Sequence, residues 1–293
     1  MDPPIRLAFS PDSDDIFMFW PLLNGKVDTG GLAFTHERAD TESLNLRADR
    51  EDVDVLAVSI ARYAALSARW LLLPHGASVG RGYGPVVVRL PRAGGPPPSL
   101  QDLEGARIGV PGLNTTAYLT LRLLLPRFLA KVVPIQPFAR SFDAVRQGEV
   151  DAALLIHEGR LVYEREGFER VADLGEAWAK LTGGLPLPLG GNVIRKGLGP
   201  DVIARVSRLC RASIVWALEH RDEVMTALLS SESRADVKLD RALLDRYLAM
   251  YANDDTRDFR EDARAAVREL FERGRAAGLV PPGAEVAFAP DAA

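Results

Sequence analysis

The order of strand-like and helix-like segments restricts the fold of this chain more than any single motif does. Short apolar runs such as Ile5–Ser10 and Val53–Ser59 alternate with segments of helical periodicity. This alternation is typical of a mostly parallel sheet covered by helices. It restarts at Arg107–Val110, after a loop rich in proline and glycine at residues 91–98, and it ends near residue 190. From Pro200 to Ala277 only helical patterns remain.

This order predicts an α/β protein in which a second domain is inserted into the first. Helices alone cannot complete a new sheet, so the C-terminal helices are expected to return and cover the first one. The expected first lobe comprises residues 1–92 and 192–293, and the expected second lobe comprises residues 93–191. Val86–Leu90 and Asn192–Arg195 are expected to be two crossing strands that act as a hinge. The pattern therefore predicts a two-lobed, hinged binding-protein fold.

Composition excludes several classes of protein. The 293 residues include 36 Lys+Arg and 40 Asp+Glu, so the net charge of −4 offers no basic surface for nucleic acid. The single cysteine, Cys210, cannot form an internal disulfide, and four scattered histidines predict no Cys/His zinc cluster. No apolar run approaches the roughly 20 residues of a membrane span, and the N-terminal segment does not resemble a secretory signal. We expect a cytoplasmic protein without a metal, a nucleic-acid partner or a membrane partner.

Ligands of open α/β sheets bind beyond the carboxyl ends of strands, where helix N-termini present free N–H groups. One such segment contains Ser10 and Asp14, although the local sequence by itself favours plain helix capping for these residues. A second is Ala57-Val58-Ser59, whose small residues let backbone N–H groups approach a ligand. A strand end with a capping serine explains that segment equally well.

A third candidate segment follows the strand Arg107–Val110. A glycine turn and two hydroxyl side chains, Thr115 and Thr116, precede a helix there, an arrangement that suits an anion. One threonine is enough to cap the helix, so the second favours a role in ligand binding. Tyr118 is expected to form a wall of the same site. The glycine spacings of nucleotide-binding loops are absent, so a nucleotide phosphate is not implied.

The fourth candidate is His157, at the carboxyl end of the apolar run Val150–Ile156. A histidine there would point into a cleft between the lobes, and imidazole can remove a proton near neutral pH. A structural histidine is the alternative. Glu158 could orient the imidazole or cap a turn. No nucleophile competes, because Gly-x-Ser-x-Gly is missing and Cys210 lies within a helical pattern as a small core residue.

Several of these residues belong to short motifs that run through most of the chain. The motifs are Phe9-Ser10-Pro11 with Asp15 and Phe17, Thr41-Glu42-Ser43-Leu44-Asn45, Gly80-Arg81-Gly82-Tyr83-Gly84-Pro85, Val110-Pro111-Gly112 with Thr115-Thr116-Ala117-Tyr118, Ile156-His157-Glu158, Leu185-Pro186-Leu187-Pro188-Leu189-Gly190, and Tyr251 with Asn253. Together they resemble the menaquinone-biosynthesis family that contains 1,4-dihydroxy-6-naphthoate synthase and chorismate dehydratase. The Thr-Thr-Ala-Tyr, Ile-His-Glu and Leu-Pro-Leu-Pro-Leu-Gly motifs point to the naphthoate synthase branch.

The resemblance implies a type II fold like that of periplasmic solute-binding proteins, in a cytoplasmic enzyme that is a monomer or homodimer and needs no cofactor. It implies a lyase that converts cyclic dehypoxanthine futalosine to 1,4-dihydroxy-6-naphthoate and releases a small sugar-derived fragment. The catalytic histidine of the family falls on His157. The expected contacts with this small-molecule substrate are Ser10, Asp14, Ala57, Val58, Ser59, Thr115, Thr116 and Tyr118.

Two departures from the branch bear on the substrate. The usual Pro-Cys-Pro-Asn-Asp is replaced by Pro11-Asp12-Ser13-Asp14-Asp15, and Ala57 stands where a lysine is common. Both changes disfavour an anionic ligand, because like charges near a buried group cost free energy. A relative of the usual substrate is therefore one alternative. The others are a solute-binding protein for a small organic acid and an enzyme like chorismate dehydratase.

Overall fold

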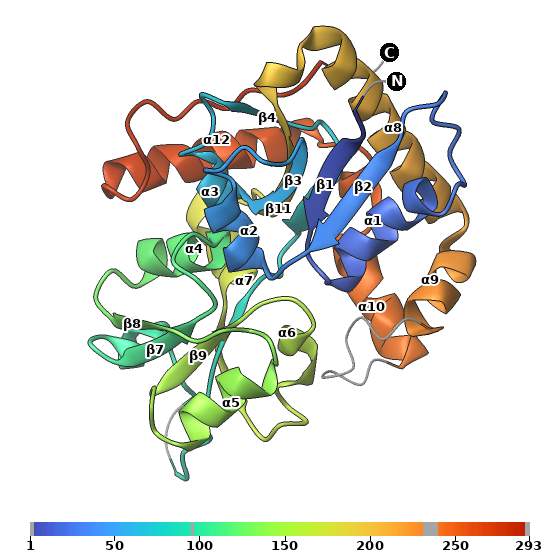
Figure 1. Ribbon diagram of the computed structural model, residues 1–293. Helices are drawn as coiled ribbons and strands as arrows, with labels where there is room; N and C mark the ends of the chain where they lie inside the picture. The colour runs from blue at the N-terminus through green and yellow to red at the C-terminus, as the bar shows by residue number, and fades with distance from the viewer. Residues whose placement is uncertain (1–2, 95–96, 231–239, 291–293) are drawn as a thin grey trace.

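In the computed structural model, which describes residues 3–94, 97–230 and 240–290, the chain forms two α/β lobes, each built on its own sheet (Figure 1). The strands of the first sheet are β1 (Ile5–Phe9), β2 (Phe34–Arg38), β3 (Val55–Ser59), β4 (Trp70–Leu72), β5 (Ser78–Gly80) and β11 (Leu187–Arg195). Those of the second sheet are β6 (Val86–Arg89), β7 (Arg107–Val110), β8 (Leu129–Val132), β9 (Ala152–Leu155) and β10 (Glu169–Asp173).

Each sheet combines parallel strands with antiparallel ones. In the first sheet the order is β2-β1-β3-β11-β4, with β1 parallel to both β2 and β3. Strand β11 runs antiparallel to β3, β4 and β5. In the second sheet the order is β10-β6-β9-β7-β8, with β7 parallel to β8 and β9, and β6 antiparallel to β9 and β10. The parallel strands of each sheet therefore end at one common edge.

Helices cover both sheets. The first lobe carries α1 (Ser13–Leu23), α2 (Thr41–Arg47), α3 (Ile60–Tyr63), α8 (Pro200–Glu219), α9 (Arg221–Ser230), α10 (Arg241–Tyr251), α11 (Asp254–Arg257) and α12 (Glu261–Ala276). The second lobe carries α4 (Thr116–Leu124), α5 (Ala139–Arg146), α6 (Gly159–Val162) and α7 (Leu174–Thr182). Two 3₁₀ turns, Leu100–Leu103 and Lys196–Leu198, complete the regular structure. Residues 231–239, which the helical pattern of the C-terminal part includes, lie outside the described residues.

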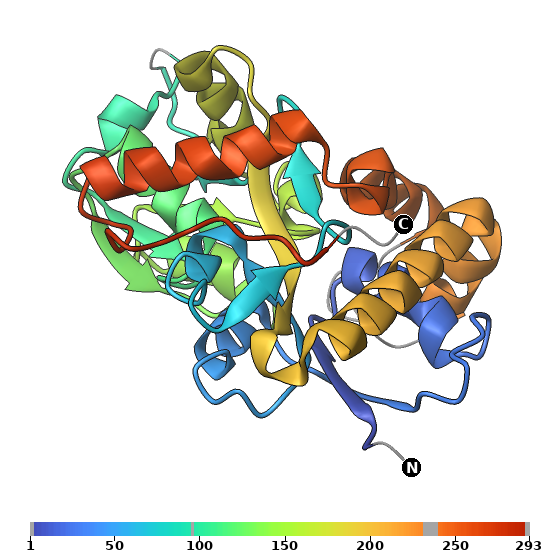
Figure 2. The same cartoon turned by 90° about the horizontal axis from the view of Figure 1, so that it is seen from above.

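The core has two parts, one on each face of the first sheet. Side chains alternate across a strand, so Leu7 and Phe9 of β1 join the part beneath α1, α8, α9 and α10, while Ala8 joins the other. That second part continues through α3, α4 and α12 into the interior of the second lobe. Helix α12 contacts β11, α3 and α4. It runs along the back of the molecule, which is the side away from the viewer in Figure 1 and the upper side in Figure 2. The two lobes thus share a continuous apolar core at the back.

The polypeptide passes between the two sheets in two places. The segments expected to cross between the lobes are Val86–Leu90 and Asn192–Arg195. The first contains β6 and the second is the end of β11, and these two strands lie in different sheets. The links themselves are residues 81–85, before β6, and residues 174–186, which contain α7. The lobe boundaries at 92/93 and 191/192 stay a prediction.

Two sequence predictions of local structure are wrong. The periodicity of Arg62–Trp70 predicts one helix, but α3 ends at Tyr63 and Trp70 begins β4. That strand forms because it pairs with β11, a partner more than 100 residues away that no local pattern reveals. The apolar run Val132–Ile135 predicts a strand, but β8 spans Leu129–Val132 and all four of its side chains are exposed. An exposed edge strand has no buried face to produce a periodic pattern.

The two links pack against each other through glycines. A Cβ placed on Gly175, in α7, would overlap the backbone carbonyl group of Tyr83, and it would lie 2.7 Å from the nitrogen of Gly84. A Cβ on Gly80 would also overlap the carbonyl oxygen of Tyr83. Backbone atoms cannot give way as a flexible side chain can, so these positions require glycine.

We therefore predict that Gly175→Ala lowers the free energy of unfolding by about 1–3 kcal/mol, because the added methyl group forces the two links apart. Urea denaturation of the parent and the variant measures this difference. Gly283→Ala is the matched control, since its Cβ would meet no atom within 4 Å. Equal midpoints for Gly175→Ala and the parent would show that the links are not tightly packed.

Candidate active site

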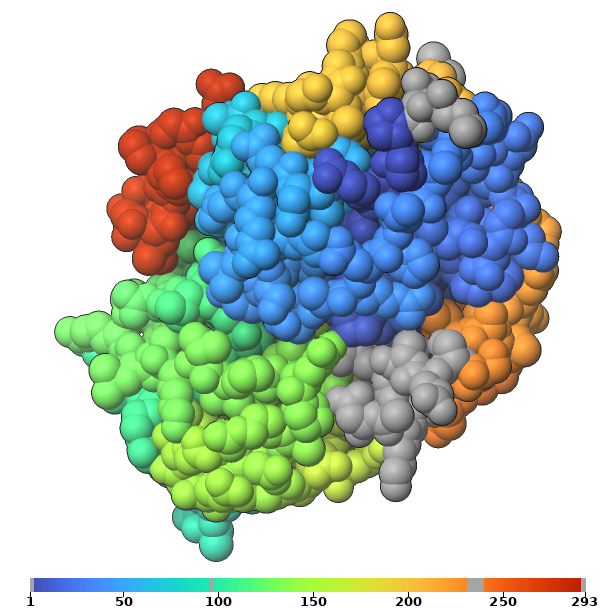
Figure 3. Space-filling model, viewed as in Figure 1, coloured from blue at the N-terminus to red at the C-terminus, as the bar shows by residue number. Residues whose placement is uncertain are grey.

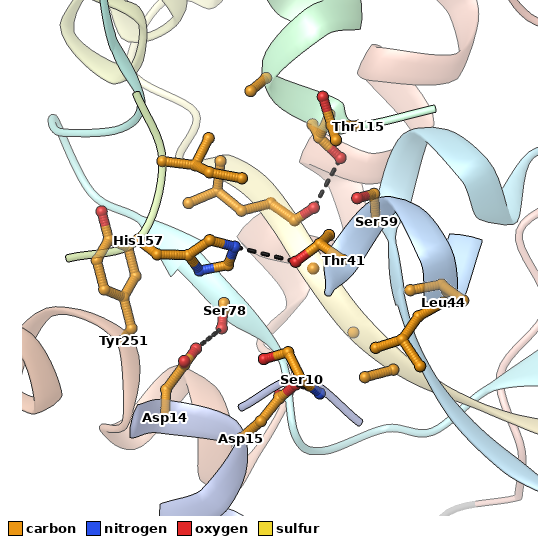
Figure 4. A pocket seen from close by; sticks show the side chains of 18 of the residues that line it. Ser10, Asp14, Asp15, Thr41, Leu44, Ser59, Ser78, Thr115, His157 and Tyr251 are labelled. Atoms are coloured by element: carbon orange, nitrogen blue, oxygen red, sulfur yellow. Dashed lines mark hydrogen bonds between the residues drawn. The ribbon is translucent and has the colours of Figure 1, made fainter. Parts of the chain in front are cut away.

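A pocket lies between the two lobes, and it is lined by residues that follow four strands (Figure 4). Ser10 follows β1, Val58 and Ser59 end β3, Thr115 follows β7, and His157 follows β9. Tyr247 and Tyr251 of α10 close another side. The cavity left between these side chains has a volume of about 90 Å³.

The pocket brings together all of the predicted site residues except Tyr118. Those that line it are Ser10, Asp14, Ala57, Val58, Ser59, Thr115, Thr116 and His157. The ring of Tyr118 instead packs edge-on against Phe128, with 6.2 Å between ring centroids, and lines a separate groove beside Arg122. Tyr118 is two positions beyond Thr116, and a helix turns by about 200° over two residues. Its side chain therefore leaves α4 on the side away from the pocket.

His157 is held in the pocket by groups from the opposite lobe. Its backbone φ of 51° lies in the left-handed region, which non-glycine residues rarely adopt. Its ring Nε2 lies 3.1 Å from Thr41 Oγ1 and 3.3 Å from Asp12 Oδ2, and its Nδ1 lies 3.4 Å from the Tyr247 hydroxyl oxygen. Figure 4 shows the ring directed toward Thr41. The imidazole is therefore fixed by the first lobe while its backbone belongs to the second.

The side of the pocket near α1 is acidic. Asp14 accepts hydrogen bonds from the Tyr247 hydroxyl at 3.0 Å and from the Ser78 hydroxyl at 2.7 Å. Asp15 accepts one from the Ser10 N–H at 2.8 Å. Burial, together with the charge of Asp14, raises the pKa of Asp15 to about 7. Burial also raises the pKa of Tyr247 well above its ordinary value, so this tyrosine keeps its proton and donates it to Asp14.

The opposite side of the pocket is the N-terminus of α4. The Thr115 hydroxyl caps the helix by accepting from the Tyr118 N–H at 3.1 Å. The Thr116 hydroxyl donates to the carbonyl of Leu189 at 2.6 Å and accepts from the Ala61 N–H at 3.0 Å. The first N–H groups of a helix have no intrahelical partner and carry partial positive charge. This side therefore suits an anionic group of a ligand.

Buried Asn45 supports the end of β3. It accepts from the Ser59 N–H at 2.9 Å and donates to the Ser59 hydroxyl at 3.1 Å. Asn45 and the pocket residues Thr41 and Leu44 come from one short helix, α2. The motif at residues 41–45 was part of the family resemblance, but nothing local marked it as part of the site.

Sequence reasoning assigned no role to Tyr247. This residue lies 233 positions after Asp14, and no spacing rule connects a tyrosine in a C-terminal helix with an aspartate near the N-terminus. Tyr251 was only part of the resemblance, and Ser78 carried no signal. These contacts depend on the return of α10 to the first lobe.

Further polar contacts join the lobes beside the pocket. Glu158 is fully buried, and its carboxylate accepts from the N–H and the hydroxyl of Ser13 at 3.2 Å and 2.8 Å. It makes no capping hydrogen bond at α6, so of the two roles that the sequence left open for Glu158, capping is not observed. The amide of Asn114 donates to Glu42 at 2.7 Å across the same boundary. On this face the first lobe, in blue, lies directly against the second, in green (Figure 3).

The described part of the chain holds no cluster of three or more His, Cys, Asp or Glu side chains that is arranged to bind a metal ion. Among the helices formed by those residues, none has the length and apolar character needed to span a membrane.

Comparison with solved structures confirms the fold class. Protein AF1704 from Archaeoglobus fulgidus superposes with a TM-score of 0.86 at 40% identity, covering 94% of this chain and 98% of its own. The alkanesulfonate-binding protein SsuA from Xanthomonas axonopodis gives a TM-score of 0.71 at 14% identity, covering 98% of this chain and 97% of its own. A Candida albicans protein described as having the generic periplasmic binding protein fold gives 0.67, also at 14% identity, with 99% of each chain covered. The last two show the fold alone.

Comparison of sequences gives the family. A family model described as menaquinone biosynthesis matches residues 5–276. A protein of Streptomyces coelicolor named 1,4-dihydroxy-6-naphthoate synthase is 37% identical, over 98% of this chain and 97% of its own. A protein of the same name from Thermus thermophilus is 36% identical, over 97% of this chain and 98% of its own. Because these matches extend over nearly the full length, the chain belongs to the menaquinone biosynthesis family.

Proposed function

We propose that this chain is a 1,4-dihydroxy-6-naphthoate synthase, a carbon–carbon lyase that acts on cyclic dehypoxanthine futalosine. The observation that carries this proposal is the position of His157, whose imidazole is held in the pocket between the lobes. The relatives that bear the synthase name match the chain nearly end to end, which supports the same reaction here.

The charge distribution of the pocket would orient such a substrate. Its carboxylate would lie at the N-terminus of α4, where N–H groups are free to donate. Its sugar-derived hydroxyl groups would lie at the opposite side, where Asp14 and Asp15 can accept hydrogen bonds. The aromatic rings of Tyr247 and Tyr251 also line the pocket and would cover the apolar part of the ligand.

His157 would act as the general base. It would take a proton from a substrate carbon, and the electron pair left behind would drive fragmentation and formation of the aromatic product. The gain of aromaticity lies in the substrate, so the protein needs to supply a placed base and a pocket that excludes bulk water. Such a step requires neither a redox cofactor nor a metal ion.

The absence of a lysine at Ala57 and the presence of Asp12 and Asp14 bear on the choice of substrate. Without a cation, the acidic side of the pocket would reject a second negative charge. We therefore propose, as a second candidate substrate besides cyclic dehypoxanthine futalosine, a relative of it that carries neutral hydroxyl groups at that end.

Turnover of cyclic dehypoxanthine futalosine, followed by the absorbance of the naphthoate product, tests the proposed function. Formation of product would support it. Tight binding of the substrate without product would instead indicate a solute-binding protein, and turnover of chorismate alone would indicate the dehydratase reaction. Either of these results would overturn the synthase assignment.

We predict that His157→Asn lowers kcat by about 10²–10⁴-fold, because asparagine preserves one hydrogen bond but cannot take up a proton. Folding and affinity for the product should be nearly unchanged. Steady-state kinetics, with thermal unfolding in parallel, measures both. The control is His220→Asn, at an exposed histidine stacked on Trp216, which should retain the parent rate. Turnover near the parent level in His157→Asn would move the role of base to Asp14 or Glu158.

We also predict that replacing Thr115 and Thr116 together with valine weakens binding of 1,4-dihydroxy-6-naphthoate by about 1.5–3 kcal/mol per charged hydrogen bond lost. The two hydroxyl groups donate to the carbonyls of Gly112 and Leu189, so they would act by fixing the start of α4, whose N–H groups would bind the carboxylate. Loss of the Thr115 cap costs ~1 kcal/mol of stability, and loss of the Thr116 hydrogen bonds to Leu189 and Ala61 costs about 1 kcal/mol each, so calorimetric titration is paired with urea denaturation. Thr120→Val is the control, since its hydroxyl bonds only to the carbonyl of Thr116 within α4. Unchanged product affinity in the double variant would show that these threonines are only structural.

A further inference from the structure

The tripeptide Asp12-Ser13-Asp14, which departs from the usual family motif, faces the His157 side of the pocket. Each side chain has a different partner: Asp12 lies against His157, Ser13 donates to Glu158, and Asp14 accepts from Tyr247. Asp12 is the only one of the three that places a charge in direct contact with the imidazole. It occupies the N-cap position of α1, yet its side chain makes no capping hydrogen bond.

We propose that Asp12 is a positioning residue whose carboxylate pairs with the imidazolium that His157 becomes when it takes the proton of the substrate. This role rests on the proposed function, because it requires His157 to be the base. The C–H bond of the substrate breaks, its electron pair stays on the substrate, and the proton forms an N–H bond on His157. Asp12 keeps its charge and takes no proton. After product release the proton passes from His157 to water.

The geometry favours such a pair. Asp12 Oδ2 lies 3.3 Å from His157 Nε2, and the Asp12 side chain is only 1% exposed. Opposite charges interact more strongly in a buried site than in water. A buried carboxylate is costly unless it is compensated, and the partial positive charge at the start of α1 supplies part of that compensation. Asp12 is therefore held as a preformed counter-charge beside the base.

The second ring nitrogen also faces an acceptor. His157 Nδ1 lies 3.4 Å from the hydroxyl oxygen of Tyr247, whose own hydrogen goes to Asp14. That oxygen can therefore only accept from the ring. An imidazolium, which carries N–H groups on both sides, would have Asp12 on one side and Tyr247 on the other. A neutral ring can donate to only one of them.

The ionisable groups that face or neighbour the ring are Asp12, Asp14 and Asp15 near α1, Glu158 at α6, and Tyr247 and Tyr251 from α10. Burial raises the pKa of Asp15 to about 7 and also raises that of Glu158, whose carboxylate is already held by Ser13. Burial raises the pKa of both tyrosines, which keeps them neutral. Asp14 acts on the ring through Tyr247. Among the described residues named here, Asp12 is thus the acidic group whose side chain directly contacts the imidazole ring.

The test compares Asp12→Asn, which has nearly the same shape without the charge, with the parent. An opposite charge within about 4–6 Å typically moves the pKa of a group by about 1–3 in the direction that favours its charged form. We expect the acid limb of the kcat profile to move down by about one pH unit or more, and the plateau of kcat to fall about tenfold to a hundredfold. KM should stay within about threefold, since the ground-state contacts remain.

Ser13→Ala is the matched control. It removes the hydroxyl bond to Glu158 between the lobes but changes no charge. Its acid limb should therefore coincide with that of the parent. If Ser13→Ala moves the limb as far as Asp12→Asn does, loss of a lobe contact explains the shift, and the role of Asp12 as a counter-charge is overturned.

A second measurement does not depend on activity. The C2 proton of His157, identified by its absence from the NMR spectrum of His157→Asn, is titrated in the parent and in Asp12→Asn without substrate. Its midpoint should be at least about one pH unit lower in Asp12→Asn. Equal midpoints would overturn the pairing even if the synthase reaction is confirmed. A shifted midpoint with an unchanged kcat profile would overturn the kinetic role, whereas absence of turnover in the parent would count against the proposed function.

Discussion

The convergence of strand ends on one cleft is the constraint on which the rest of the structure depends. Parallel strands end at a common edge, and here the edges of two separate sheets face each other. Ser10 and Ser59 come from one edge, and Thr115 and His157 come from the other. Neither lobe alone holds an imidazole next to an acidic wall. The chemistry of the site therefore requires both lobes and the contacts that keep them together.

The contacts between the lobes are of two kinds, and they lie on different sides of the molecule. At the back, an apolar core runs through α3, α4 and α12 without interruption. At the front, the contacts are polar, such as Glu42 with Asn114 and Ser13 with Glu158. Polar groups can exchange these partners for water at small cost, whereas separation of an apolar core exposes its whole area. Ligand exchange is thus easier at the front, where His157 lies, than at the back.

The polarity of the pocket links fold to specificity. The start of α4 supplies N–H donors, whereas the start of α1 supplies the carboxylates of Asp12, Asp14 and Asp15. The two ends of the pocket therefore differ in charge, although both are helix N-termini. Helix N-termini favour anions, and α1 uses that preference for its own aspartates. Of these two helices, α4 is the one that can offer it to a ligand. A substrate that carries a carboxylate at one end and hydroxyl groups at the other fits this difference.

Local patterns determined those parts of the site that lie next to an element boundary. The apolar run before His157 predicted its place at a strand end, and Thr115 predicted the start of α4. The two-lobed α/β architecture also followed from the order of elements. Only the tertiary structure decided that Tyr247 meets Asp14, that Trp70 begins a strand, and that Tyr118 leaves α4 on the far side. A strand end or a helix cap is a local arrangement of hydrogen bonds, which a few residues specify. Contacts between distant segments depend on how whole lobes pack, and no short stretch of sequence contains that information.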